Sequence, residues 1–251
     1  MATNYQGAQR TLNIAHRGAS AAAPPNTLAA FAAALELGAD GIEFDVRLCA
    51  DGVPVVIHDA TVDATTDGSG PVANMTLSAL RELDAGSWFD GSFAGERIPT
   101  LAEVLEAVGG RMQVNVELKG GALLNDRLER AVAAEIERHG LAEQVLLSSF
   151  NPLILRRVQR IDPLLSTGLL YTSTARPKIG ISRLIAPRPH AAVHPHHTLV
   201  DEGHVQWARR HGYRINVWTV DDAAQMRRLI DLGVDGIITN VPDLFRGVLG
   251  K

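Results

Sequence analysis

The stretch GIEFDVRLCADGVPVVIHD, residues 41–59, contains two strand-like runs on either side of a turn. The runs are Gly41–Leu48 and the β-branched Pro54–His58. A crossover between parallel strands needs a dozen or more residues, so two runs this close must pair antiparallel. Asp51-Gly52 is a strong signal for a two-residue type I′ turn. The stretch therefore predicts a β-hairpin.

A two-residue loop also predicts the register of this hairpin. With Asp51 and Gly52 as the loop, Ala50 faces Val53. Asp45 then lies directly opposite His58, with their Cα atoms about 4.5–5.5 Å apart. A bulge near Pro54 that slips the register by one residue would turn His58 to the other side.

Strand-like runs and helix-like stretches alternate along the rest of the chain, which predicts βα units and a mainly parallel sheet. The nine candidate strands are Leu12–His16, Gly41–Leu48, Pro54–His58, Gln113–Lys119, Val145–Phe150, Ser166–Tyr171, Ala191–His194, Arg214–Val220 and Gly236–Asn240. Because Pro54–His58 is assigned to the hairpin, eight strands remain. With 251 residues, the chain has the usual length of a (β/α)8 TIM-type barrel.

Capping residues mark the expected helices. The signals are Thr27–Leu37 followed by Gly38, the capping box Thr100-Leu-Ala-Glu103, Asn125 before a helix running to His139, Asn151-Pro152, and Asp221-Asp222. Residues 60–97 are rich in glycine and predict a small insertion, with one short helix near Thr76–Leu83. No second independent domain is evident, so residues 1–251 are expected to form one barrel domain.

Composition excludes several classes of protein. The chain is 46% hydrophobic and 21% charged, with a net charge of −4 and no long run of one sign. It therefore lacks the basic surface of a nucleic-acid-binding or membrane-surface protein. Cys49 is the only cysteine, which excludes an intrachain disulfide.

No apolar run reaches the roughly 18–20 residues of a membrane span, and Met1–Arg10 has no signal-peptide core. A cytoplasmic setting is expected, and the sequence carries no signal for an oligomeric state.

Polar groups follow four of the predicted strands at their carboxyl ends, where (β/α)8 barrels build active sites. These groups are His16-Arg17, Glu43-x-Asp45, His58-Asp59 and Asn115-x-Glu117-x-Lys119. Alternation along a strand points Glu43 and Asp45 together into the barrel. Two converging carboxylates repel each other unless a cation joins them. Glu117 would complete a three-carboxylate site, and oxygen ligands favour Mg²⁺ or Ca²⁺ over zinc.

Each of these signals alone is more often structural, as an ion pair or a layer of polar side chains. Their coincidence at matching strand ends favours a functional site, because a structural layer needs no such set of acids, histidines and cations. Lys119, one step above Glu117, could meet an anion.

Together the motifs resemble those of the glycerophosphodiester phosphodiesterases, from Ile14 to about Asp243. The matching segments are His16-Arg-Gly-Ala-Ser20, Asn26-Thr27, Glu43-Phe-Asp45-Val46, His58-Asp59, Thr65-Thr-Asp-Gly-Ser-Gly70, Ile98-Pro-Thr-Leu101, Glu117-Leu-Lys119, Ser148-Ser-Phe150, Val217-Trp-Thr-Val220 and Gly236-Ile-Ile-Thr-Asn240.

The resemblance implies an α/β fold with a distorted barrel and an inserted subdomain, acting on glycerophosphodiesters to give sn-glycerol 3-phosphate and an alcohol. It also implies roles for single residues. One divalent cation, Mg²⁺ or Ca²⁺, would be held by Glu43, Asp45 and Glu117. His16 as base and His58 as acid would move protons. Arg17 and Lys119 would bind phosphate, and the resemblance favours Trp218 as a substrate wall over a core filler.

Two positions depart from the family's pattern. Pro25 stands where a Glu is usual, which removes support for His16 or Arg17, and Ala64 replaces a usual Arg. Pro25 keeps open a non-catalytic descendant that binds glycerol phosphate.

Two hydrolase alternatives share the barrel. A lysophospholipase D-like enzyme would need an apolar ramp at the barrel mouth, for which Phe89 and Phe93 are the hints. A metal-dependent amidohydrolase would need His-x-His on the first strand, and the sequence there is His16-Arg17-Gly18. A histidine tract at residues 190–197 is interpreted as a polar rim, with His194 near the pocket.

Overall fold

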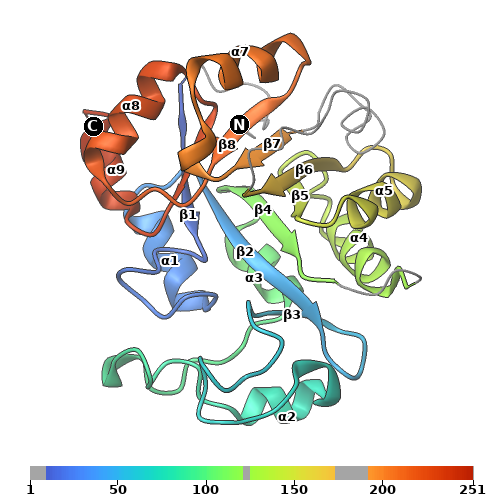
Figure 1. Ribbon diagram of the computed structural model, residues 1–251. Coiled ribbons are helices and arrows are strands. Elements are labelled where there is room, and N and C mark those ends of the chain that lie inside the picture. Colours follow the sequence, from blue (N-terminus) through green and yellow to red (C-terminus); the bar gives the residue numbers. More distant parts are fainter. Residues whose placement is uncertain (1–9, 121–124, 173–191, 251) are drawn as a thin grey trace.

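The computed structural model describes residues 10–120, 125–172 and 192–250. Within them, eight parallel strands form a closed ring (Figure 1). The ring runs through β1 (Leu12–His16), β2 (Gly41–Leu48), β4 (Gln113–Leu118), β5 (Val145–Ser149), β6 (Ser166–Tyr171), β7 (Ala192–Pro195), β8 (Arg214–Val217) and β9 (Gly236–Thr239). β1 pairs with both β2 and β9, which closes the ring. The predicted (β/α)8 barrel is confirmed.

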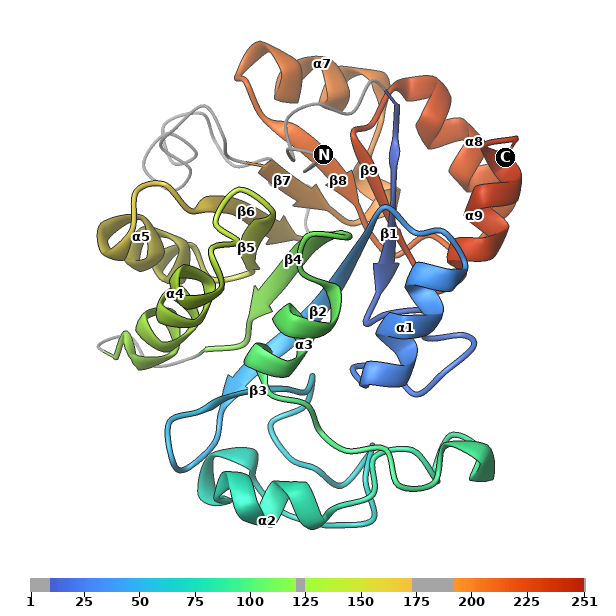
Figure 2. The ribbon, with the colours of Figure 1, turned by 180° about the vertical axis from the view of Figure 1, so that it is seen from behind.

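Helices surround the ring on its outer side (Figure 2). They are α1 (Leu28–Glu36), α3 (Leu101–Val108), α4 (Arg127–His139), α5 (Pro152–Ile161), α7 (Glu202–Arg210), α8 (Ala223–Leu232) and α9 (Pro242–Val248), and a 3-10 turn η3 (His197–Leu199) precedes α7. Thr27, Asn151 and Asp222 cap their helices, and Thr100 and Glu103 form the expected capping box. The helix expected to be capped by Asn125 begins at Arg127, with Asp126 as its N-cap. Within the described residues, no helix is long and apolar enough to cross a membrane.

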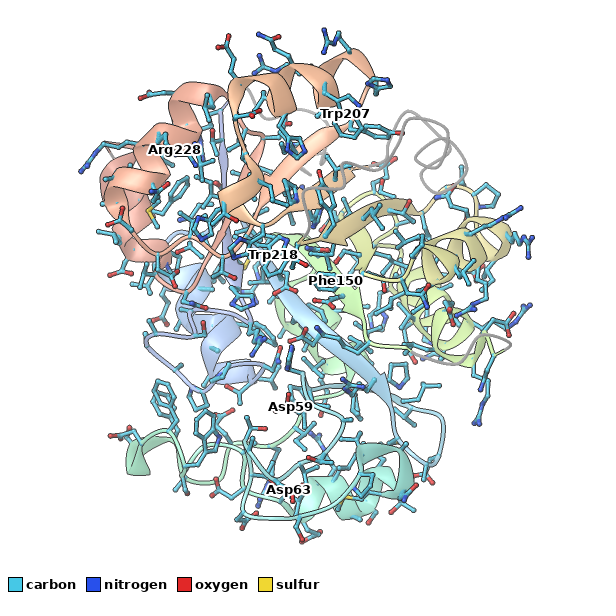
Figure 3. All side chains as sticks on the ribbon, in the orientation of Figure 1. Asp59, Asp63, Phe150, Trp207, Trp218 and Arg228 are labelled. Atoms are coloured by element: carbon cyan, nitrogen blue, oxygen red, sulfur yellow. The ribbon has the colours of Figure 1, made fainter. Side chains whose placement is uncertain are left out.

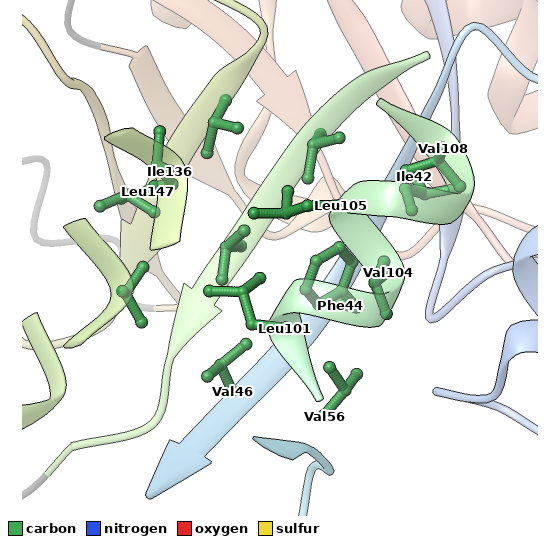
Figure 4. Packing of buried hydrophobic residues seen from close by; sticks show 14 of the residues in the cluster. Ile42, Phe44, Val46, Val56, Leu101, Val104, Leu105, Val108, Ile136 and Leu147 are labelled. Atoms are coloured by element: carbon green, nitrogen blue, oxygen red, sulfur yellow. The ribbon is translucent and has the colours of Figure 1, made fainter. Parts of the chain in front are cut away.

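The main core lies between the outer face of the strands and these helices. Figure 4 shows Ile42, Phe44 and Val46 of β2 packed against α3. Each of the three is fully buried, because alternate residues of the strand point outward to the helices. The same alternation turns Glu43 and Asp45 toward the inside of the barrel.

The predicted hairpin is present, but its register differs by one residue from the prediction. β3 (Pro54–Val56) runs antiparallel to β2 and pairs Val46 with Val56. The loop has three residues, 50–52, because Cys49 N donates to Val53 O at 3.1 Å. Gly52 adopts φ +77°, the left-handed position that closes a three-residue hairpin loop. The predicted two-residue turn is therefore wrong.

The slip places Ile57 opposite Asp45, since Ile57 N donates to Asp45 O at 3.0 Å. The prediction that Asp45 faces His58 directly is also wrong. β3 ends at Val56, two residues earlier than expected, and the chain bends at His58. Arg47 Nε donates to the His58 carbonyl at 2.9 Å and holds this bend. Strand alternation therefore does not control the direction of His58, and its side chain still lines a cavity with Arg17.

Residues 60–97, which we call the insertion, lie outside the ring beyond β3 (Figure 1). They contain α2 (Leu77–Glu82), capped by Thr76, and the short 3-10 turns η1 (Val72–Asn74) and η2 (Gly91–Phe93). A separate apolar cluster joins the insertion to the hairpin. Its buried members are Cys49, Val55, Ile57, Val62, Val72, Leu80, Ala85 and Ile98.

Candidate active site

Three carboxylates from the neighbouring strands β2 and β4 converge. Asp45 and Glu117 are register partners on these neighbouring strands, and Glu43 lies two residues before Asp45. One oxygen from each of Glu43, Asp45 and Glu117 lies within 4.8 Å of the other two, and all three residues are buried. The structure thus brings together the three predicted metal ligands.

Two cations partly neutralise this cluster. Lys119 Nζ lies 2.6 Å from Glu117 Oε1 and 3.1 Å from Asp45 Oδ1. Arg17 Nε lies 3.2 Å from Asp45 Oδ2. The three carboxylates together carry one more charge than these two cations supply. Glu43 Oε2 is buried and has no hydrogen-bond partner among the described residues.

The pKa values follow from this arrangement. Burial, reinforced by the charges of Asp45 and Glu117, raises the pKa of Glu43 well above its usual value. Burial also raises the pKa of Glu117 against the opposing effect of Lys119. Burial alone would raise the pKa of Asp45, but Lys119, Arg17 and Asn26 outweigh it and lower that pKa. The acid that lacks a cation of its own, Glu43, is the one most strongly disfavoured as an anion.

These observations fit a divalent cation. The donors are all carboxylate oxygens, the ligands that Mg²⁺ and Ca²⁺ accept. The oxygen without a partner, Glu43 Oε2, belongs to the same cluster. A cation bound there would satisfy this oxygen and compensate the excess negative charge.

His16 ends β1 beside the carboxylates. Its Nε2 lies 3.9 Å from Glu43 Oε2, and its Nδ1 is 2.7 Å from Asn240 Oδ1. Burial, followed by the charge of Arg17, lowers the pKa of His16 to about 4. The imidazole is therefore neutral near pH 7, with one nitrogen turned toward the carboxylate cluster.

His58 reaches the site from the hairpin. Its Nδ1 lies 2.8 Å from Asp59 Oδ1, and 38% of its side chain is exposed. Arg17, Pro25 and Thr65 line the same cavity, between the barrel mouth and the insertion. Figure 3 labels Asp59 in this region. The replacement residue Pro25 therefore borders the candidate site itself.

Asn26 makes contacts that sequence reasoning did not assign to it. Its Nδ2 donates to Asp45 Oδ2 at 3.0 Å, and its backbone has φ +64°. Arg17 also has a positive φ, +56°. Residues other than glycine adopt this region at a cost, and such positions cluster at functional sites. The only sequence signal was the placement of Asn26, a residue type that tolerates left-handed backbone.

Trp218 directly follows β8 at the barrel mouth (Figure 3). Its Nε1 donates to the His194 carbonyl at 2.8 Å, which fixes the ring. Phe150 and His196 pack edge-to-face on it, with centroids at 5.4 and 5.2 Å. Phe150 is 44% exposed. Sequence reasoning named Trp218 but missed its two aromatic neighbours.

The structure does not support two expectations from the sequence, the polar rim at His194 and the apolar ramp at Phe89 and Phe93. His194 is fully buried inside the barrel, where Asn216 Nδ2 lies 3.2 Å from its Nε2, so it does not belong to a polar rim. His190 lies outside the described residues. Phe89 and Phe93 pack on each other at 5.7 Å, and neither lines the cavity beside His58.

Comparisons with known proteins agree with this geometry. A sequence model described as the glycerophosphoryl diester phosphodiesterase family matches residues 16–244. The glycerophosphodiester phosphodiesterase of Caldanaerobacter subterraneus subsp. tengcongensis is 44% identical over 244 residues, covering 96% of this chain and 99% of that relative.

Solved structures are similar as well. An Oleispira antarctica phosphodiesterase in complex with the product sn-glycerol-3-phosphate has a TM-score of 0.87 at 30% identity, covering 95% of this chain and 96% of that one. A glycerophosphodiester phosphodiesterase from Agrobacterium tumefaciens has a TM-score of 0.82 at 36% identity, covering 94% and 99%.

Proposed function

The chain belongs to the glycerophosphoryl diester phosphodiesterase family, and on that premise we propose a metal-dependent hydrolysis that yields sn-glycerol 3-phosphate and an alcohol. The observation that carries the proposal is the buried triad of Glu43, Asp45 and Glu117 with its unpartnered Glu43 oxygen. The product bound to the Oleispira antarctica relative supports a glycerol phosphate as the product here.

Glu43, Asp45 and Glu117 would hold one Mg²⁺ or Ca²⁺. The bound cation supplies positive charge that stabilises the phosphoryl oxygens as negative charge develops on them. Arg17 and Lys119 add two further positive charges beside the triad, and they would bind the same phosphate. Charge neutralisation of this kind is the main requirement for attack on a phosphodiester anion.

The two histidines would move the protons. His16 is neutral near pH 7 and serves as the base, taking a proton from water or from the neighbouring glycerol hydroxyl. If the glycerol hydroxyl attacks, it gives a cyclic phosphate that water then opens. His58 serves as the acid that protonates the leaving alcohol, and the contact of its Nδ1 with Asp59 Oδ1 at 2.8 Å would orient the ring. Trp218 would form a wall for the glycerol or the head group.

The test is an assay of sn-glycerol 3-phosphate release from glycerophosphocholine and from a lysophospholipid, with chelation followed by addition of Mg²⁺ or Ca²⁺. We expect release from glycerophosphocholine, loss on chelation and recovery with metal. Preference for the lysophospholipid would indicate the lysophospholipase D-like alternative. Binding of glycerol phosphate without turnover under any metal condition would indicate a non-catalytic descendant.

Substitutions test the roles of the histidines. His16→Ala and His58→Ala should each lower kcat at least roughly 10²-fold, the scale of acid–base catalysis, with the fold retained. The double variant should lose much less than the product of the two single losses, because the pair acts as a unit. His139→Ala, on α4, is the matched control and should leave kcat unchanged. Near-normal turnover in either single variant would remove that histidine from the mechanism.

A further inference from the structure

We propose that Asn240 is a positioning residue that keeps the proton of neutral His16 on Nδ1, and that Asp221 fixes the orientation of the Asn240 side chain. This inference rests on the proposed function, because it gives the base of that reaction its free nitrogen. Asn240 follows β9, which pairs with β1, so it lies beside the strand that ends at His16.

The Asn240 side-chain oxygen is the group that meets His16. Asn240 Oδ1 lies 2.7 Å from His16 Nδ1 and accepts a second hydrogen bond from Ser20 Oγ at 2.8 Å. A side-chain oxygen of asparagine only accepts hydrogen bonds. In this orientation of the amide, His16 donates from Nδ1.

Asp221 decides the orientation of the amide. Its carboxylate accepts from Asn240 Nδ2 at 2.6 Å, from the Asn240 backbone N at 2.8 Å and from Thr239 Oγ1 at 3.0 Å. An ionised carboxylate has no proton to donate, so it holds the NH₂ group of Asn240 on its own side. The amide oxygen is thereby turned toward His16. Although Asp221 is exposed, these three hydrogen bonds fix its position.

The consequence concerns the other nitrogen of His16. With the proton on Nδ1, the lone pair of Nε2 is free and faces Glu43 and the candidate metal ligands. When Nε2 takes up a proton, Asn240 Oδ1 still accepts from Nδ1 and stabilises the imidazolium. A reversed amide would present its NH₂ group to Nδ1, so that the lone pair lies on Nδ1 and the proton of the neutral ring lies on Nε2. Nε2 could then not accept a proton. Asn240 therefore acts through His16.

Histidine ¹⁵N chemical shifts distinguish the two tautomers, so the test is NMR of the ¹⁵N-histidine-labelled full chain above pH 7. His16→Gln identifies the His16 signals. In the wild type we expect the proton on Nδ1. In Asp221→Asn the amide orientation is no longer enforced, and we expect signal for the Nε2-protonated form. That variant should also lose about tenfold in kcat with KM changed less than about twofold, a part of the roughly 10²-fold acid–base contribution.

Asp222→Asn is the matched control, since it makes the same chemical change one residue away. Asp222 caps α8 by accepting from Gln225 N at 2.8 Å, and asparagine caps equally well. This control should leave the His16 tautomer and kcat unchanged. Asn240→Leu should lose roughly 10²-fold in kcat; if it does not fold, the surface variant Asp221→Asn decides alone.

The outcomes separate this inference from the proposed function. A wild-type His16 protonated on Nε2, or a tautomer unaltered in Asp221→Asn, overturns the positioning role even if the enzyme is active. The expected tautomers in a protein that hydrolyses no glycerophosphodiester uphold the positioning role and overturn the proposed function.

Discussion

His194 shows how a single buried side chain makes stability depend on pH. Its ring lies inside the barrel, and burial, followed by the charge of Arg214, lowers its pKa from 6.5 to about 3. Between these values the unfolded chain binds a proton that the folded protein does not bind. The contribution of neutral His194 to the free energy of unfolding is therefore complete above about pH 6.5, and it is lost progressively as the pH falls toward 3.

His194→Gln should remove this part of the pH dependence, because glutamine does not titrate and its oxygen still accepts from Asn216. The free energy of unfolding, measured with urea at several pH values, should fall less steeply in the variant between pH 6.5 and 3. The difference in slope should approach about 1.4 kcal/mol per pH unit, the effect of one proton. Parallel curves would show that His194 titrates normally in the folded protein.

At the scale of residues, the parts of the site that follow from strand alternation could be predicted. Glu43, Asp45 and Glu117 converge because their apolar neighbours must face the helices. Asn26 and Asn240 could not be predicted as partners of Asp45 and His16. Their roles depend on a positive φ and on a strand pairing across 224 residues, neither of which leaves a local pattern.

At the scale of elements, the hairpin shows where a turn rule fails. Asp51-Gly52 fits a two-residue turn, in which both residues need positive φ, and also a three-residue loop, in which only Gly52 does. The insertion favours the latter. Ala50 N donates to Met75 O at 2.8 Å, and Leu77 N donates to Asp51 Oδ2 at 2.7 Å. The register is therefore set in part by residues 75–77, which no local pattern in the hairpin includes.

Gly52 gives a test of this loop. Gly52→Val should lower the free energy of unfolding by about 1–2 kcal/mol, because a β-branched residue is strained at φ +77°. Gly52→Asn should lose less than half as much, since asparagine tolerates this conformation. A Cβ at this position meets only the flexible end of Arg127, at 3.1 Å, so crowding does not explain a loss. Equal losses in urea unfolding would contradict the assigned backbone conformation.

At the scale of the whole molecule, the insertion and the barrel share the site. The apolar cluster of the insertion includes Val55 and Ile57 of the hairpin, immediately before His58. The carboxylates of Glu43, Asp45 and Glu117 belong to β2 and β4 instead, and Lys119 directly follows β4. Disturbing the insertion should therefore affect the acid, His58, more than the metal ligands.

Leu80→Ala tests this division, because Leu80 is fully buried in the cluster of the insertion. The cavity should cost about 2–5 kcal/mol, and kcat should fall while the rise in Tm on adding Mg²⁺ or Ca²⁺ is kept. Leu229→Ala is the matched control, because Leu229 is a fully buried residue of α8 in a different apolar cluster. It should lose similar stability without a selective loss of kcat below its unfolding temperature. Equal kcat losses in the two variants would contradict the idea that the insertion supports His58 while the barrel supports the metal ligands.

The pairing of β1 with β9 has a consequence for how the protein is made. A ribosome synthesises His16 long before Asn240, which lies 224 residues later. At typical synthesis rates this interval lasts roughly 10–45 seconds. During that time β1 of the nascent chain lacks one of its two neighbours, and its hydrogen-bonding edge is open to pairing with other chains. Molecular chaperones that cover this edge until β9 emerges would therefore raise the yield of closed barrels, and a translation product truncated before β9 would lack both the closing strand and the partner of His16.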